Sequence, residues 1–368
     1  MREYALVAAV AAAVTYLLTP VARWVAFRTD SVARPRDRDV HAIPTPRLGG
    51  VAMYAGVAAA LVVAENLPTM QRVAQSSSAP RAVLVAGGLL CLLGMLDDRF
   101  TLDALTKLAG QTLAAGVLVL LGVQLLLVPF VPGRGVISLS PDIAVPLTVL
   151  LVLVTVNAVN FVDGLDGLAA GVVGIAGLAF FAFSYQLSVV RDVDRADSPT
   201  LIAAVLVGVC AGFLPHNFSP ARIFMGDSGS MLLGLLLAAA AVSVTGQSDV
   251  GYDLTGTDAV APALFAPVLL PLVVLAVPVG DLVLAVVRRT RAGMSPFAAD
   301  RGHLHHRLLD VGHSHRRAVL ILYGWTALLA GSGVAVSFTR PAVVVGGLVV
   351  GVLVLVTVAR RTPKRSRT

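Results

Sequence analysis

Long apolar runs separated by short polar segments dominate the chain. We identify eleven apolar segments, at residues 4–26, 48–65, 81–96, 105–127, 143–159, 167–189, 200–215, 229–246, 260–287, 318–338 and 341–359. A helix needs about 20 apolar residues to cross a bilayer, and within lipid it satisfies its backbone hydrogen bonds internally. The pattern therefore predicts an all-α, polytopic integral membrane protein with about eleven transmembrane helices.

Composition agrees with a membrane protein and disfavours a soluble one. Hydrophobic residues make up 57% and charged residues 13% of the 368 residues, whereas soluble domains carry about 25% charged residues. The net charge of +7 could indicate a nucleic-acid partner, but the basic residues lie between apolar segments, so we expect none. Both cysteines, Cys91 and Cys210, lie inside apolar runs, which predicts no disulfide.

The distribution of basic residues predicts the orientation. If Arg34, Arg36 and Arg38 are cytoplasmic and the sides alternate along the chain, most of the 28 Lys and Arg residues lie inside. The acidic residues show no such bias, which is the positive-inside signature. The N-terminus is then outside, and residues 361–368 form a basic cytoplasmic tail after a single transmembrane domain at residues 1–360. We expect the external segments 71–79 and 191–199 to be solvated linkers.

Two adjacent carboxylates, Asp97 and Asp98, stand at the inner end of the third predicted helix. The partial negative charge of a helix C-terminus disfavours them, so a divalent cation or a nearby base should compensate. A solvated pair at a membrane exit is the alternative. Thr101 can cap the next helix, which makes Asp103 structural. Lys107, at the entrance of that helix, either snorkels to the interface or contacts phosphate.

A second polar segment holds Asn157, Asn160, Asp163 and Asp166, and each aspartate precedes a glycine. Two acids at i and i+3 face the same way if the segment is helical, and glycines let a ligand approach closely. Polar groups without a basic residue are expensive near a membrane, which indicates function. A simple Asp-Gly turn, the alternative, needs only one aspartate.

A third polar segment, residues 215–230, ends in Gly-Asp-Ser-Gly-Ser. Asp227 or Ser228 could merely cap the following helix. The same arrangement also offers free N–H groups and a carboxylate, which suit a phosphate and a metal ion together.

The fourth segment, residues 300–307, reads Asp-Arg-Gly-His-Leu-His-His-Arg. A His-rich tract can bind zinc, but the spacing is not His-Glu-x-x-His and no cysteine assists. Arginine with clustered imidazoles fits a polyphosphate better. Carboxylates from three segments and cations from a fourth favour Mg²⁺, for which Mn²⁺ could substitute. His313 and His315, further on, are expected to be solvated.

These motifs, in this order, carry a resemblance to a known family. The chain resembles the polyprenyl-phosphate N-acetylhexosamine-1-phosphate transferases. The matching stretches are His-Ala-Ile-Pro-Thr-Pro-Arg-Leu-Gly-Gly at 41–50, the Asp97-Asp98 pair, and residues 157–167, 220–230 and 300–306. The resemblance implies ten or eleven spans, and a reaction in which a lipid phosphate attacks the β-phosphate of a UDP-sugar. Exchange of one pyrophosphate linkage for another agrees with the absence of a Walker-type phosphate loop.

The resemblance also implies roles for individual residues. Asp97 would be the base or organiser of the lipid phosphate, and a one-step and a two-step mechanism both stay open. We expect metal binding by Asp227 and Asp98, catalytic roles for Asp97, Asp98, Asp163, Asp166, His305 and His306, and substrate or cofactor binding by Asn160, Asn217, Phe224, Arg301, His303 and Lys107. Asn217 and Phe224 would contact the uridine.

The fourth segment bears on the substrate. Its His-Leu-His-His is similar to the GlcNAc-1-phosphate branch, whereas the peptidoglycan branch usually shows three consecutive histidines. The first motif also has no lysine where that branch often has one. We therefore expect polyprenyl-diphospho-GlcNAc and UMP as products, starting a cell-envelope glycopolymer. The alternatives are a phospho-MurNAc-pentapeptide translocase and, more distantly, an ion-coupled transporter. We also expect a bacterial inner-membrane location and a cytoplasmic active site. The sequence leaves the oligomeric state open, with a homodimer as one alternative.

Overall fold

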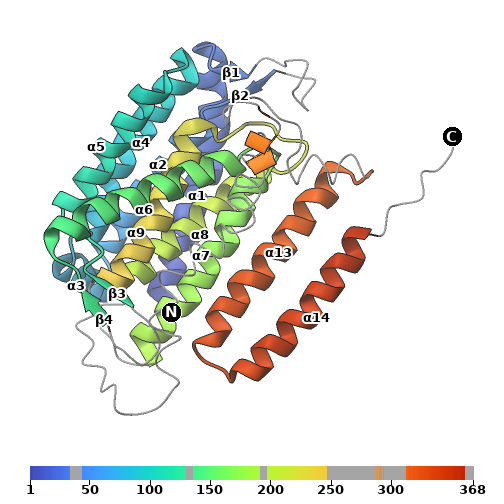
Figure 1. Ribbon diagram of the computed structural model, residues 1–368. Helices are drawn as coiled ribbons and strands as arrows, with labels where there is room; N and C mark the ends of the chain where they lie inside the picture. Colours follow the sequence, from blue (N-terminus) through green and yellow to red (C-terminus); the bar gives the residue numbers. More distant parts are fainter. Residues whose placement is uncertain are drawn as a thin grey trace.

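The computed structural model describes residues 1–33, 44–129, 136–190, 197–246 and 312–360, with a few isolated positions from 287 to 293, and these form a helical bundle (Figure 1). The helices are α1 (Arg2–Arg28), α2 (Gly49–Ala64), α3 (Pro68–Ser76), α4 (Ala79–Phe100), α5 (Ala104–Leu120), α6 (Pro141–Val162), α7 (Leu168–Tyr185), α8 (Asp197–Asn217), α9 (Gly226–Gly246), α13 (His315–Val336) and α14 (Pro341–Arg360). A π-helical turn (Gln186–Val190) extends α7. Two short antiparallel pairs join β1 (Val32–Ala33) to β2 (Thr45–Pro46) and β3 (Leu127–Pro129) to β4 (Val136–Ser138).

Ten of the eleven predicted apolar segments coincide with helices. Within the described residues, eight helices are long and apolar enough to cross a membrane, and the shorter apolar helices α2 and α5 add two more. The segment predicted at 260–287 lies almost wholly outside the described residues. The protein is therefore a helical, multi-pass membrane protein, while the count of eleven and the orientation stay predictions.

Helix α9 forms the centre of the bundle. It is apolar on every side and almost entirely buried, which is the pattern of a helix surrounded by others. Helices α2, α4, α6 and α8 pack against it. The position of α9 matters because its first turn carries Asp227.

Small residues set the close spacing on the α1 side. A Cβ added at Gly208 or Gly212 of α8 would lie 2.4 or 2.2 Å from a backbone oxygen of α1. Glycine thus lets the two backbones touch, as is common between membrane helices.

The segment at residues 71–79, predicted to be an external solvated linker, is mostly exposed, but it is largely helical. It contributes most of α3, in which Met70 and Val73 are buried. The Glu3 carboxylate accepts hydrogen bonds from the backbone N–H groups of Thr69 (3.0 Å) and Met70 (3.2 Å). It thereby caps the N-terminus of α3 from 66 residues away. Of the other external segment, residues 197–199 begin α8, and Ser198 is buried there.

Helices α13 and α14 form an antiparallel hairpin beside α7 (Figure 1). Contrary to prediction, His313 is buried. Its Nε2 lies 2.8 Å from the backbone oxygen of Ala359 at the end of α14. Arg317 donates to the Val358 oxygen on the same turn. Cationic or donor side chains at a helix C-terminus satisfy its free carbonyl groups, so these two residues cap α14. His315 is only partly exposed.

Candidate functional site

The site begins where the first and third motifs meet. The N–H groups of Gly49 and Gly50, at the start of α2, donate to the backbone oxygens of Phe224 (3.0 Å) and Met225 (2.9 Å). The Phe224 N–H donates in turn to the Pro46 oxygen at 2.8 Å. Segments about 175 residues apart in sequence are thus joined by backbone hydrogen bonds. They hold the loop that leads into α9.

Glycines allow α2 and α4 to reach the first turn of α9. A Cβ added at Gly50 would lie 2.1 Å from the Gly229 nitrogen, and one added at Gly94 would lie 2.2 Å from the Ser228 nitrogen. Gly226 has a φ of +69°, a left-handed conformation that glycine adopts without strain. The sequence pattern alone gave no role to Gly94.

The Asp98 carboxylate, at the end of α4, caps the N-terminus of α9. Its oxygens accept hydrogen bonds from the N–H groups of Asp227 (3.2 Å) and Ser228 (3.4 Å). The partial positive charge of the α9 N-terminus offsets the unfavourable position of Asp98 at a helix C-terminus. The compensation expected from a cation or a base therefore comes, for Asp98, from another helix. Its proposed metal ligation stays a prediction.

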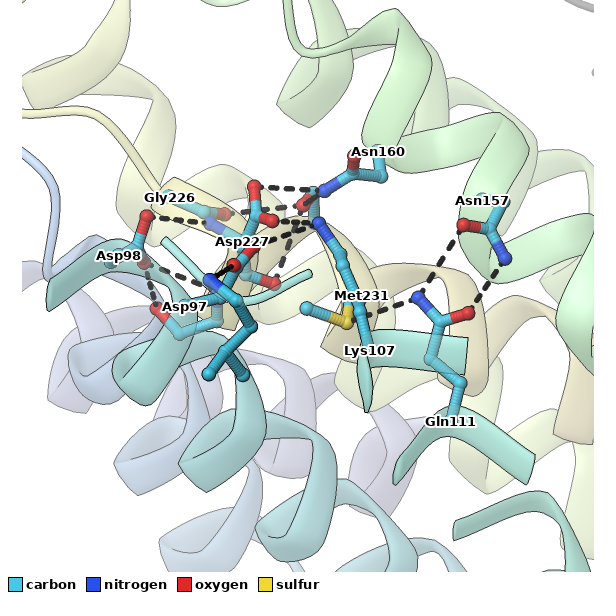
Figure 2. Close-up of polar contacts among 12 residues, drawn as sticks. Asp97, Asp98, Lys107, Gln111, Asn157, Asn160, Gly226, Asp227 and Met231 are labelled. Atoms are coloured by element: carbon cyan, nitrogen blue, oxygen red, sulfur yellow. Dashed lines mark hydrogen bonds and ion pairs between the residues drawn. The ribbon is translucent and has the colours of Figure 1, made fainter. Parts of the chain in front are cut away.

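Lys107 bridges the other two carboxylates (Figure 2). Its Nζ lies 2.9 Å from Asp97 Oδ2 and also pairs with Asp227 Oδ2. The remaining oxygen of Asp97 accepts a hydrogen bond from the Leu102 N–H at 2.8 Å. Both aspartates and the lysine are largely buried, so the pairs are less screened than surface ion pairs. The ammonium of Lys107 therefore lies among carboxylates, which the sequence did not predict, and its contact with phosphate stays a prediction.

Asn160, in the last turn of α6, joins the same cluster. Its Nδ2 donates to Asp227 Oδ1 at 3.0 Å and to Ser230 Oγ at 2.9 Å. Asp227 therefore receives hydrogen bonds from α5 and α6 while it sits on α9 (Figure 2). We call Asp97, Asp98, Asp163 and Asp227, with Lys107 and Asn160, the carboxylate cluster.

Asp163 follows the last residue of α6, so the segment is not helical there and the i,i+3 relation to Asp166 does not apply. Burial, together with the negative charges of Asp227 and Asp98, raises the pKa of Asp163 to about 8. Four carboxylates thus lie near one another, and Lys107 bridges two of them, Asp97 and Asp227. An excess of hard oxygen ligands of this kind suits Mg²⁺.

A preformed metal cage is not part of the cluster. Among the residues that the structure describes, no three His, Cys, Asp or Glu side chains are arranged to hold a metal ion. Mg²⁺ usually binds through one or two carboxylates and completes its shell with water and substrate phosphates. Asp227 and Asp163 fit that mode, because Asp227 has an exposed fraction of 28% and Asp163 is only partly buried.

Asp166 and Asn217 join the two loops behind the cluster. Asp166 Oδ2 accepts a hydrogen bond from the Ala221 N–H at 2.9 Å. Asn217 Oδ1 accepts from the Gly167 N–H at 3.1 Å, and its Nδ2 donates to the Ile223 oxygen at 3.0 Å. Both side chains are buried, so they position the loops. Nucleotide contact by Asn217 stays a prediction, as does contact by the half-buried Phe224.

The helix cap at the start of α5 differs from the prediction. Thr101 ends α4 with a φ of +49°, and Asp103 is the N-cap residue of α5. Asp103 Oδ1 accepts from the N–H groups of Leu105 (3.0 Å) and Thr106 (2.9 Å). Hydrogen bonds from Thr106 lower the pKa of Asp103. The structural role predicted for Asp103 is confirmed, but in the capping position that Thr101 was expected to take.

Part of the predicted site lies outside the described residues, namely Arg301, His303, His305, His306 and the start of the first motif at 41–43. One polar residue near the cluster was not predicted. Gln111 of α5 is buried and pairs with Asn157 of α6. A lone glutamine inside an apolar run was the signal that could have found it, because a polar residue within a span needs a partner.

Comparison with known proteins identifies the family of the chain. Residues 81–245 match glycosyl transferase family 4. The chain is 48% identical to a decaprenyl-phosphate N-acetylglucosaminephosphotransferase of Mycolicibacterium smegmatis over 99% of this chain and 90% of that protein. A Mycobacterium tuberculosis protein of the same name is 49% identical over 98% and 90%.

A more distant relative extends the comparison beyond the mycobacteria. The Bacillus subtilis protein named "Probable undecaprenyl-phosphate N-acetylglucosaminyl 1-phosphate transferase" is 33% identical over 83% of this chain and 77% of its own length. High identity over nearly the whole length shows membership in a family of enzymes, which argues against a transporter. The chain therefore belongs to glycosyl transferase family 4, among its polyprenyl-phosphate N-acetylglucosaminephosphotransferases.

Proposed function

We propose that this enzyme transfers GlcNAc-1-phosphate from UDP-GlcNAc to a polyprenyl phosphate, with Mg²⁺, at the cytoplasmic face of a bacterial cell membrane. The products are polyprenyl-diphospho-GlcNAc and UMP. The observation that carries the proposal is the carboxylate cluster, because side chains from α4, α5, α9 and the end of α6 converge at one end of the bundle. The printed names of the relatives supply the sugar and the class of lipid.

The chemistry needs positioning and charge neutralisation more than covalent help. A lipid phosphate oxygen forms a bond to the β-phosphorus of UDP-GlcNAc, while the bond from that phosphorus to the bridging oxygen breaks and UMP leaves. Bound Mg²⁺ would neutralise charge on the phosphates, with Asp227 and Asp163 as the residues that hold it. Lys107 is placed to contribute a positive charge beside the reacting phosphates. Asp97, hydrogen-bonded to Lys107 and the Leu102 N–H, is held in a fixed orientation to receive a proton.

The location of the cluster supports a surface active site. Helices α2, α5 and α9 begin at this end of the bundle, and α4 and α6 end there. A water-soluble UDP-sugar and a membrane-embedded lipid phosphate can meet only near a lipid–water boundary. Because UDP-sugars are cytoplasmic and the basic residues favour this side, we place the site at the inner face.

One assay separates the GlcNAc proposal from the peptidoglycan alternative. The purified protein in detergent receives a polyprenyl phosphate, Mg²⁺ and either UDP-GlcNAc or UDP-MurNAc-pentapeptide, and UMP release is measured. We expect release only with UDP-GlcNAc, and none when EDTA removes the metal. Release with the MurNAc donor alone would reject the proposed substrate. A folded protein that releases no UMP with either donor would reject the reaction.

A further inference from the structure

We infer that Gln111 and Asn157 form a positioning pair, which sets the relative heights of α5 and α6 so that Lys107 and Asn160 both reach Asp227. This inference rests on the proposed transferase reaction, because it concerns the same carboxylate cluster. The pair lies one helical turn deeper in the bundle than the cluster (Figure 2).

Gln111, Asn157 and Met231 form a deeper layer. Helices α5, α6 and α9 each carry one residue of the carboxylate cluster and one residue of this deeper layer. On α5, Gln111 follows Lys107 by four residues, and on α9, Met231 follows Asp227 by four. On α6, which runs the opposite way, Asn157 precedes Asn160 by three residues. Residues three or four apart lie on the same face of a helix. Helices α5, α6 and α9 therefore contact one another through side chains at the cluster and again in the deeper layer, one turn away.

The contacts within the deeper layer are specific. Asn157 Nδ2 donates to Gln111 Oε1 at 2.7 Å, and Gln111 Nε2 lies 3.4 Å from Asn157 Oδ1. Gln111 Nε2 also lies 3.4 Å from the sulfur of Met231. Gln111 is 2% exposed. A two-way amide pair has one favourable geometry, so sliding α5 along α6 by a fraction of a turn would break it.

Packing alone does not account for an amide pair at this depth. An apolar pair would fill the space without the cost of placing two amides within a membrane-spanning layer. Polar pairs between helices can instead specify register, which apolar contacts leave loosely defined. Register is what the cluster needs, because the contact between Asn160 Nδ2 and Asp227 Oδ1 is 3.0 Å long and tolerates little displacement.

The test compares Gln111→Met and Asn157→Ala, singly and together, with the unchanged protein. Methionine keeps the volume of Gln111 and removes its amide, and Asn157 lies on an exposed face, so its truncation leaves the core packed. The matched control is Gln124→Met, since Gln124 donates to the Val119 oxygen (3.1 Å) just beyond the far end of α5. UMP release gives kcat and the KM for both substrates, and size-exclusion chromatography gives the folded fraction.

We expect kcat per folded molecule to fall about tenfold to a hundredfold in each single variant, with KM changed little, because misplacement of reacting groups acts on the transition state. The double variant should lose no more than the worse single variant, since either change breaks the same pair. The control should keep its kcat. Losses that multiply in the double variant, or a kcat for Gln111→Met equal to that of the control, would overturn the inference. An inactive unchanged protein would instead point to failure of the proposed function.

Discussion

Replacement of Gly94 by alanine should strongly lower kcat while leaving most of the fold intact. Gly94 lies on α4, one turn before the Asp97-Asp98 pair, and faces the first turn of α9. An added Cβ would lie 2.2 Å from the Ser228 nitrogen, 2.3 Å from the Ser228 Cα and 2.5 Å from the Asp227 carbonyl carbon. All three atoms are backbone, so no side chain can rotate away. Helix α4 and the start of α9 must separate.

The size of the separation follows from these contacts. Ordinary contact between non-bonded heavy atoms is about 3.5 Å, so the two backbones must move apart by about 1 Å. Overpacking of this kind costs about 1–3 kcal/mol of folding free energy. The same movement displaces Asp227 from Lys107 on α5 and Asn160 on α6, and about 1 Å of misplacement can cost about a hundredfold in rate. We therefore expect kcat to fall about a hundredfold.

Gly116→Ala is the matched control for this change. Gly116 also lies inside a helix, α5, but an added Cβ there meets no atom within 4 Å. Alanine favours a helix over glycine, so the control should be as stable as the unchanged protein or slightly more so. UMP release per folded molecule, measured in detergent, compares the two variants. Activity of Gly94→Ala within about threefold of the Gly116→Ala value would refute the argument that α4 and α9 must touch at this glycine.

Three further substitutions separate catalysis from structure. Asp227→Asn should reduce UMP release at least a hundredfold with little loss of folded protein, because it removes the charge that faces Lys107; near-normal turnover would remove Asp227 from the proposed metal site. Asn217→Ala should destabilise the protein by about 2 kcal/mol, measured as Tm, since it leaves two buried backbone groups unpaired; an unchanged Tm would show that water replaces the amide. Asp103→Ala should lower Tm slightly at pH 7 with kcat unchanged. Because the folded-state pKa of Asp103 is lowered, its stabilising effect is present above the ordinary aspartate pKa and is lost as pH falls through the lowered value. The difference in Tm should therefore vanish in strong acid, and a difference that persists there would contradict the capping argument.

The spans could be predicted from the sequence because length and hydropathy of a run are local properties. Helix α3 could not, since only Met70 and Val73 mark its buried side and the residue that caps it, Glu3, lies far away in sequence. His313 was misjudged for the same reason. Its partner is the Ala359 carbonyl group at the end of another helix, which no pattern near residue 313 reveals.

The residue types of the site could be predicted, but not the way in which their charges are balanced. A pair of aspartates at a helix C-terminus is electrostatically unfavourable, and the sequence predicted that a cation or a base compensates their charge. For Asp98 the compensating group is the N-terminus of α9, which begins 128 residues later. That contact depends on Gly50 and Gly94, which allow three helices to meet. Close approach of backbones is a property of the assembled bundle, so a single sequence does not display it.

The way in which the charges are balanced argues for where a divalent cation would be most stabilised. Asp98 is compensated by two N–H groups of α9, and Asp97 by Lys107 and the Leu102 N–H. Asp227 shares Lys107 with Asp97 and receives a hydrogen bond from the neutral amide of Asn160. Burial and the negative charges of Asp227 and Asp98 raise the pKa of Asp163 although the positive charge of Arg47 opposes the shift, so the negative charge of Asp163 is poorly stabilised. A divalent cation beside Asp163 and Asp227 would therefore offset the repulsion between their negative charges. Such a cation would bind more strongly there than at an exposed surface, because electrostatic interactions are stronger where water is scarce. In the proposed reaction a diphosphate would be drawn to that cation and to Lys107, so substrate and metal would complete each other's coordination.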